Sequence, residues 1–262
     1  MENNQLKFVR YAHEFIIDQE MLMDKHMIIS HLLNLSILTS AKHDQLLQDN
    51  HLAKSLQENQ VWVVTQYKIN INQPWKLSSK IKIVTRLIQV NRFFVVRYFE
   101  IFSEDICIME VYAQFAAIDF VKRSVVRLEL EMLNNHHLVD DSISVRFDKL
   151  QANHQDQKIL STPILIQASD IDENQHVNNG VYLRWALVTL QRLKDLASDI
   201  SMIEIKYGKE LLMNHKVSMD VYQLSQNEIK MQINNESDQK VACMIKFTMK
   251  NMEETHDKFK DS

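Results

Sequence analysis

The sequence predicts an α+β protein of two units, each a curved antiparallel sheet wrapped around one long central helix. Three observations lead to this prediction. The order of one strand, one long helix and then several strands occurs twice along the chain. The strand-like runs follow one another with short breaks, which favours antiparallel pairing. The first helical segment has apolar residues on all sides, and such a helix has to be buried against a sheet.

The elements of the first unit follow from residue type. A mixed apolar and polar run at 7–17 is typical of a strand. The segment at about 24–47 lacks proline and glycine, and Asp24 can cap it, so we expect the long helix there. Runs rich in β-branched and aromatic residues then predict five strands, at 61–72, 78–90, 92–102, 106–120 and 124–130.

The second unit repeats this order with little sequence identity to the first. We divide the chain into an N-terminal unit at 1–134, a polar connector at 135–157, a C-terminal unit at 158–250 and a charged tail at 251–262. The strands and the helix of the C-terminal unit are expected at 158–169, 178–196 (the helix), 200–208, 216–225, 228–235 and 240–250.

Composition excludes several classes of function. With 45% hydrophobic residues among 262, the chain can form a sizeable core. A net charge of −4 argues against a nucleic-acid partner, and two glycines are too few for phosphate-binding loops. No apolar run reaches the roughly 18 residues of a membrane helix, and the start does not read as a signal peptide, so we expect a cytoplasmic protein without membrane contact. Cys107 and Cys243 stand among apolar residues and are expected to be reduced and buried in the core.

One stretch, "DIDENQHVNNGVYLRW" from Asp170, concentrates hydrogen-bonding side chains before the second helix. Turns and helix caps explain part of it, because Asn178 or Asn179 is a good N-cap. A calcium loop starting at Asp172 would need glycine and glutamate where Val177 and Leu183 stand. A zinc site would need at least three ligands, and the stretch has one histidine. We therefore expect no metal and no cofactor.

A catalytic interpretation explains the histidine better. In an extended segment Asp172, Asn174 and His176 would point the same way, placing an acid, an amide and an imidazole on one wall. The helix start near Asn179 and Gly180 would add N–H donors for an oxyanion, and Gly180 would leave room for a ligand. These groups suit acyl transfer.

The same stretch resembles the signature of the acyl–acyl-carrier-protein thioesterases. The pattern Asp-x-Asn-x-His-Val-Asn-Asn followed by tyrosine is present from Asp172 to Tyr182. The HVNN part is shared by many hotdog-fold thioesterases, whereas the Asp-x-Asn-x-His part is more specific. A second family element, a tyrosine, basic residues and a glutamate on a strand, is matched by "IEIKYGKEL", and Glu210 lies 34 positions after His176 (210 − 176). The run from "VWVVTQYK" to "IVTRL" is similar too, so the resemblance covers about 5–250.

The resemblance implies a tandem double hotdog, with an acyl-chain pocket mainly in the N-terminal domain and catalysis in the C-terminal one. It implies hydrolysis of fatty acyl thioesters on acyl carrier protein during fatty acid biosynthesis. The carried-over residues are Asp172, Asn174, His176 and Glu210 as catalytic groups, with Asn178, Asn179 and Gly180 at the substrate. Partners would then be acyl carrier protein and a fatty acyl chain, and the only prosthetic arm is the substrate's phosphopantetheine.

Some alternatives stay open from sequence. Many plant members have cysteine after the glutamate, but Leu211 stands here, so the mechanism should rest on carboxylate, histidine and water. Either Glu210 or Asp172 could activate water or attack directly. An acyl-CoA thioesterase and a non-catalytic acyl-binding protein are the rival functions, and monomer and homodimer both fit. Four cations near the motif are weak candidates for docking the acidic carrier, with plain surface the alternative for each: Arg184, Lys206, Lys209 and Lys216.

Overall fold

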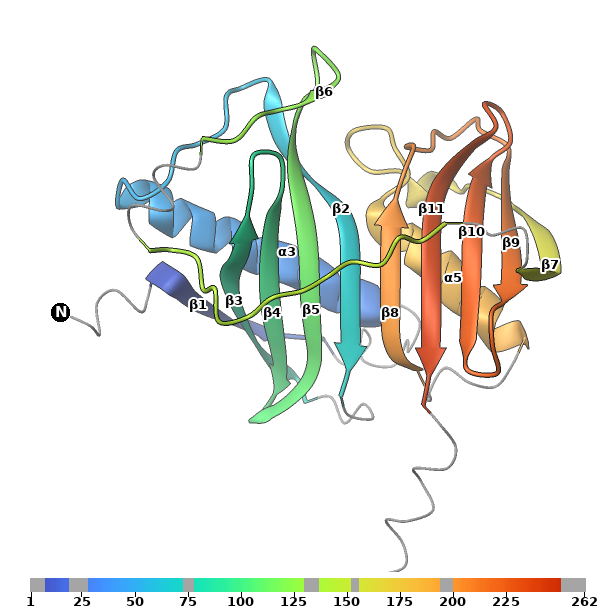
Figure 1. Ribbon diagram of the computed structural model, residues 1–262, viewed down its shortest axis with the longest axis horizontal. Helices are drawn as coiled ribbons and strands as arrows, with labels where there is room; N and C mark the ends of the chain where they lie inside the picture. The colour runs from blue at the N-terminus through green and yellow to red at the C-terminus, as the bar shows by residue number, and fades with distance from the viewer. Residues whose placement is uncertain are drawn as a thin grey trace, which may run out of the picture. The chain divides into compact units, whose positions relative to one another are not determined.

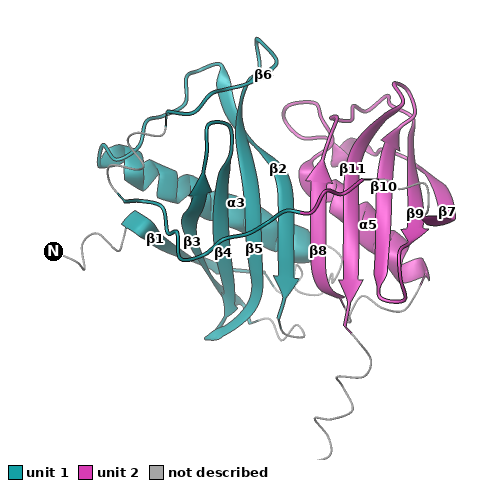
Figure 2. Ribbon diagram, in the orientation of Figure 1, with its two compact units in different colours: residues 1–147 teal, residues 148–262 magenta. Residues whose placement is uncertain are grey.

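The computed structural model describes residues 8–18, 28–72, 78–129, 137–151, 156–193 and 200–250. The chain divides into two compact units, 1–147 and 148–262, and each is described by itself (Figure 2). Within the described residues, no helix is long and apolar enough to cross a membrane.

The described residues of unit 1 form one antiparallel sheet and one long helix, α3 (Figure 1). The sheet order is β1-β3-β4-β5-β2, and the short β6 pairs with β5. The elements are β1 (Arg10–Ile16), α3 (Ile28–Asp49), β2 (Gln60–Ile71), β3 (Lys80–Val90), β4 (Val95–Ser103), β5 (Ile106–Asp119) and β6 (Ser124–Val125). The predicted strand at 124–130 is therefore wrong at 126–129, and residue 130 lies outside the described residues. The predicted cap Asp24 lies outside the described residues.

Alternation along β4 assigns the two faces of this sheet. Arg97 and Phe99 are buried on the side of α3, where Arg97 contacts His43 of the helix. Val96 and Tyr98 point to the opposite face and pack beneath Val145 and other residues that follow the sheet. Side chains of both faces are thus covered, which explains why β4 is buried along nearly its whole length.

A buried polar cluster lies between α3 and this sheet. Arg97 can only donate, so its bond to His43 Nδ1 (3.0 Å) makes that nitrogen an acceptor, and Nε2–H donates to the Phe8 carbonyl (2.9 Å). Burial, together with the adjacent Arg97 charge, lowers the pKa of His43 to about 3. Arg97 is also paired with Asp44. His43 is therefore neutral in the folded protein at neutral pH.

Unit 2 repeats the plan with a sheet in the order β8-β11-β10-β9-β7 and the helix α5 (Figure 1). Its elements are β7 (Gln157–Ile164), the 3-10 turn η1 (Ala168–Asp170), α5 (Asn179–Leu193), β8 (Ile200–Tyr207), β9 (Val217–Gln223), β10 (Glu228–Asn235) and β11 (Lys240–Met249). The buried side of α5 carries Tyr182, Leu183, Ala186, Leu187 and Leu190. The order of strands and helix in this unit is as predicted.

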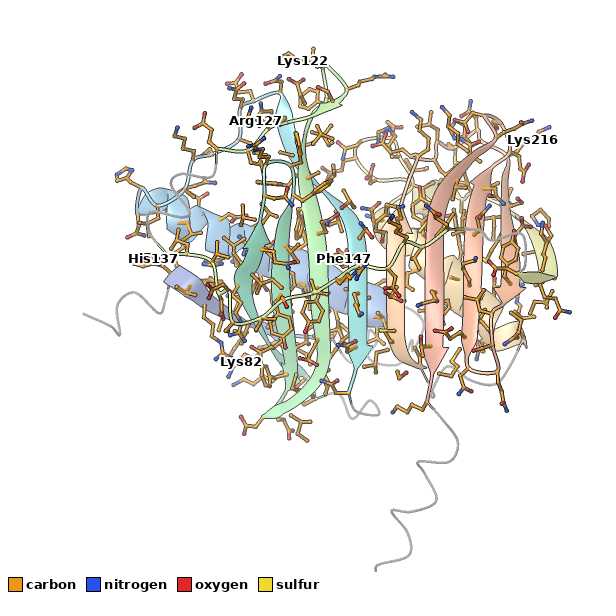
Figure 3. The ribbon with its side chains drawn as sticks, in the orientation of Figure 1. Lys82, Lys122, Arg127, His137, Phe147 and Lys216 are labelled. Atoms are coloured by element: carbon orange, nitrogen blue, oxygen red, sulfur yellow. The ribbon has the colours of Figure 1, made fainter. Side chains whose placement is uncertain are left out.

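The described parts of the predicted connector, 137–151 and 156–157, contact the sheets. In unit 1, Val139 bridges to Leu87, Asp140 pairs with Arg86 at 3.0 Å, and Phe147 packs on the sheet (Figure 3). In unit 2, Asp148 lies 3.3 Å from Lys246. The buried Lys230 pairs with Asp156 and donates to the carbonyl of Gln151 at 2.9 Å. The segment is polar because its carboxylates form ion pairs with Arg and Lys side chains of the sheets, and one of its carbonyls accepts a hydrogen bond from Lys230.

The two cysteines differ in burial. Cys243 is fully buried on β11, as predicted, whereas Cys107 is only partly buried near the start of β5, so its predicted burial is wrong. Both are free thiols. Cys107 lies at the start of β5, next to the exposed Ile106, and the first buried residues of this strand are Ile108 and Met109.

Candidate active site

The motif between η1 and α5 folds as a tight loop. Asp172 accepts a hydrogen bond from Gln175 N–H (3.0 Å), Gln175 takes a left-handed φ of 64°, and Asp172 N–H donates to the carbonyl of His176 (2.8 Å). Ile171 and Val177 form an antiparallel bridge at the base of the loop. The predicted extended wall of residues is therefore wrong. A short polar stretch between two bridged residues closes into a turn instead, because its own side chains supply acceptors.

The Asp172 carboxylate holds this turn. Its Oδ1 accepts the backbone N–H groups of Asn174 (2.8 Å) and His176 (3.2 Å). Such an Asx turn satisfies donors that the reversal of the chain leaves without partners. The geometry thus gives Asp172 a clear task in shaping the loop.

The loop brings His176 to Glu210. The distance between His176 Nε2 and Glu210 Oε2 is 3.4 Å, with the histidine side chain 35% exposed and the glutamate side chain 65% exposed. His176 and Glu210, which are 34 positions apart in the sequence (210 − 176), therefore lie next to each other in the folded chain. A partly enclosed imidazole and a solvent-exposed carboxylate thus lie side by side. Such a pair can activate water.

Glu210 lies in the loop after β8, since that strand ends at Tyr207. The prediction of a glutamate on a strand is wrong for this reason. Its position is set by the next residue, because the buried Leu211 accepts the N–H of Val177 through its carbonyl at 2.8 Å. That bond joins the Glu210 loop directly to the histidine loop.

Asn174 is the one predicted catalytic residue that stays apart. It is exposed, and among the described residues its side chain makes no hydrogen bond with His176 or Glu210. Its backbone N–H is used by Asp172.

Asn178 caps α5, which begins at Asn179. The Asn178 Oδ1 accepts the N–H of Gly180 at 2.9 Å, and its carbonyl accepts the N–H of Val181 at 2.9 Å. Tyr207 donates its hydroxyl to the carbonyl of Asn179 at 3.1 Å. The predicted cap is confirmed, and it occupies one of the N–H groups that sequence reasoning offered to an oxyanion.

Two contributors to the loop were missed from sequence. Asp170 is 1% exposed and its carboxylate pairs with Arg184 of α5. Arg184, expected as a weak docking cation, is thus an internal partner. The available signal was a second acid two positions before Asp172 and a cation on the first turns of the following helix.

Tyr182 and Cys243 are two buried titratable residues of unit 2. Burial raises the pKa of the Tyr182 phenol, and a hydrogen bond from the backbone of Leu211 opposes that shift. Burial also raises the pKa of the Cys243 thiol, so this cysteine stays protonated. With Leu211 directly after Glu210, the described site offers carboxylate and imidazole as reacting groups.

Two grooves lie elsewhere in the described residues. One of about 540 Å³ in unit 2 is lined by β7, β9 and residues such as Met213 and Lys216 (Figure 3), and one of about 650 Å³ lies in unit 1 beside Phe147. Neither is lined by His176 or Glu210.

Family models match most of the chain. The acyl-ACP thioesterase N-terminal domain model matches residues 9–136, and the C-terminal domain model matches residues 153–251. A search of curated proteins finds no match.

Two solved structures have a similar fold. An acyl-ACP thioesterase from Bacteroides thetaiotaomicron is 19% identical with a TM-score of 0.71, over 95% of this chain and 100% of that one. The 12:0-ACP thioesterase from Umbellularia californica is 14% identical with a TM-score of 0.71, over 91% and 96%. The chain belongs to the acyl-ACP thioesterase family and is a thioester hydrolase.

Proposed function

We propose that this protein hydrolyses fatty acyl thioesters carried by acyl carrier protein, in the cytoplasm and during fatty acid biosynthesis. It releases the free fatty acid and the holo carrier protein. Membership of the family supports thioester hydrolysis and favours this carrier. The observation that carries the proposal is the contact between His176 and Glu210 at the loop that precedes α5.

Glu210 is the general base of the proposed mechanism. Its carboxylate is open to solvent and touches His176, whereas one Asp172 oxygen is held by two backbone N–H groups. Glu210 takes a proton from water while the water oxygen adds to the thioester carbonyl carbon. The tetrahedral oxyanion then collapses, the carbon–sulfur bond breaks, and His176 relays the proton to the leaving thiolate. Direct attack by Glu210, giving a mixed anhydride, is the alternative and uses the same pair.

The helix start is the proposed oxyanion site. Gly180 and Val181 already donate their N–H groups to Asn178, so the N–H of Asn179 is the donor that we assign to the oxyanion. Asn174, exposed at the tip of the loop, would orient water or the substrate carbonyl.

The fold is proposed to be a tandem double hotdog, one domain per unit. The support is the repeated plan of one antiparallel sheet and one long helix, together with the similar fold of two acyl-ACP thioesterases. As in the family, the N-terminal domain is expected to hold most of the acyl-chain pocket. Lys206, Lys209 and Lys216 remain candidates for docking the acidic carrier.

The first test is release of free fatty acid from matched series of acyl-carrier-protein and acyl-CoA substrates. Wild type should prefer the carrier-protein series, and His176→Ala should lose activity by orders of magnitude. The matched control is His137→Ala, an exposed histidine of unit 1, which should keep full activity (Figure 3). Preference for acyl-CoA would refute the proposed substrate. Acyl binding without release would make the protein an acyl-binding member of the fold.

A further inference from the structure

We propose that Asp170 and Arg184 are positioning residues that hold the catalytic loop so that His176 faces Glu210. This inference rests on the proposed function, because it assigns a task within the same reaction. Neither residue touches His176 or Glu210 among the described contacts, so both act through the loop.

The Asp170 carboxylate is buried, and each of its oxygens has a hydrogen-bond partner. Its Oδ2 accepts the N–H of Gln167 at 2.8 Å, which caps η1, and its Oδ1 is paired with Nη2 of Arg184. Asp170 is 1% exposed and Arg184 is 28% exposed. A carboxylate in such a place is costly without a cation, so Arg184 is required by the charge that it neutralises.

The backbone of Asp170 ties this pair to the loop. Its carbonyl accepts the N–H of Asn178 at 2.9 Å, so one residue fastens both the entrance and the exit of the loop. Between those ends stands the bridge of Ile171 with Val177. Val177 in turn donates to the carbonyl of Leu211, the neighbour of Glu210, at 2.8 Å.

The resulting path runs through covalent neighbours and hydrogen bonds only. Arg184 fixes Asp170 against α5, Asp170 fixes the loop ends, and Val177 fixes His176 relative to Glu210. The contact between Nε2 and Oε2 is 3.4 Å, and at that length a small displacement of either loop separates the two side chains. Supporting residues of this kind typically decide whether a site is productive.

Three variants test the assignment, with Arg192→Ala as the matched control because it removes an exposed arginine from the same helix. Arg184→Ala and Asp170→Asn should lower kcat for acyl-carrier-protein hydrolysis by about 10- to 100-fold, the range found when supporting partners are lost, with little change in KM. Arg184→Lys should recover much of kcat, because one N–H donor and the charge are restored. Assays are run well below the unfolding temperature of each variant, measured in parallel.

A second readout does not depend on turnover. The NMR signals of the His176 imidazole, assigned with His176→Gln, should move in Arg184→Ala and stay in place in Arg192→Ala. Unchanged kcat and unchanged imidazole signals in folded Arg184→Ala would overturn the proposal. A rise in KM alone would make Arg184 a docking residue and overturn it too. If wild type releases no fatty acid, the proposed function fails, and the imidazole signals still decide whether the pair positions His176.

Discussion

At the scale of single residues, the structure shows different surroundings for two acids that the sequence alone does not distinguish. Asp172 and Glu210 are both carboxylates in family-like positions, and either could be the reacting group from sequence alone. Their surroundings differ, since Asp172 is used by backbone N–H groups and Glu210 faces solvent and His176. The sequence pattern predicts the presence of both carboxylates, whereas their different surroundings depend on how the chain turns.

Replacing Glu210 should therefore affect mainly activity, and replacing Asp172 should lower the free energy of unfolding. Glu210→Gln should lose catalysis by orders of magnitude while its free energy of unfolding changes by less than about 0.5 kcal/mol, as for exposed side chains. Asp172→Ala should lower the free energy of unfolding by about 1–2 kcal/mol, because two N–H groups lose their acceptor. Urea unfolding and turnover are measured on the same samples. Full activity in Glu210→Gln would contradict its assignment as base.

Gly208 is the glycine whose neighbours leave least room. A Cβ at this position would stand 2.4 Å from the carbonyl oxygen of Val241, a backbone atom of β11 that cannot move aside alone. We expect Gly208→Ala to lower the free energy of unfolding by about 1–3 kcal/mol, the usual cost of overpacking, and to disturb the nearby Glu210 loop. Thermal unfolding and kcat check this. An unchanged melting temperature would show that the loop adapts at no cost.

At the scale of elements, the sequence predicts strands well where buried and exposed side chains alternate and where turn residues mark the strand ends. The strands that became β2, β3 and β5 were predicted within one or two residues of their ends, because their β-branched runs are bounded by asparagine, serine or proline. The prediction of a strand at 124–130 was wrong at 126–129 because propensity alone does not supply a partner, and of the described residues in this segment Ser124 and Val125 form the strand that pairs with β5. The loop at 172–176 failed for the opposite reason, since side-chain acceptors overrode the extended pattern.

The cap of α5 provides a test at this scale. Asn178→Ala removes the acceptor of the Gly180 N–H and should lower the free energy of unfolding by about 1 kcal/mol. Asn178→Asp keeps an acceptor at the same place and should restore most of that loss. Denaturant midpoints of the two variants decide the matter. Equal midpoints for Asn178→Ala and wild type would show that the cap is not energetically important.

At the scale of the whole molecule, each unit has its own core and its own buried polar groups. In unit 1 the neutral His43 makes stability depend on pH. Its folded pKa of about 3 lies below its ordinary value, so the unfolded chain binds a proton first as the pH falls. The contribution of the neutral His43 to the free energy of unfolding is fully present above about pH 6.5, the ordinary pKa of histidine, and is lost as the pH falls toward 3.

The corresponding experiment compares wild type with His43→Gln. The glutamine does not titrate, so the stability advantage of wild type over the variant should shrink between pH 7 and pH 5. The exposed His137→Gln serves as control and should follow wild type at both values. Denaturant unfolding of each protein at the two pH values provides the comparison. A constant difference between wild type and His43→Gln would contradict a neutral buried His43.

The connector carries a prediction about buried charge in unit 2. Asp156→Ala leaves Lys230, which is 3% exposed, without its carboxylate and should lower the free energy of unfolding by about 3–5 kcal/mol. Adding Lys230→Met should recover most of that loss, because the buried charge is then gone. Urea unfolding of the single and double variants tests this. A double variant no more stable than Asp156→Ala would mean that the lysine stem, not its charge, matters.

The attached connector also bears on how such a two-unit chain can be cut and recombined. A fragment starting at 158, where the sequence pattern alone places the second unit, would leave behind Asp148, Gln151 and Asp156, and with them partners of Lys230 and Lys246. A fragment starting at 148 would keep them. The residues of the connector are therefore part of the units whose sheets they contact. Exchanging units between relatives would require each unit to be transferred together with its own part of the connector.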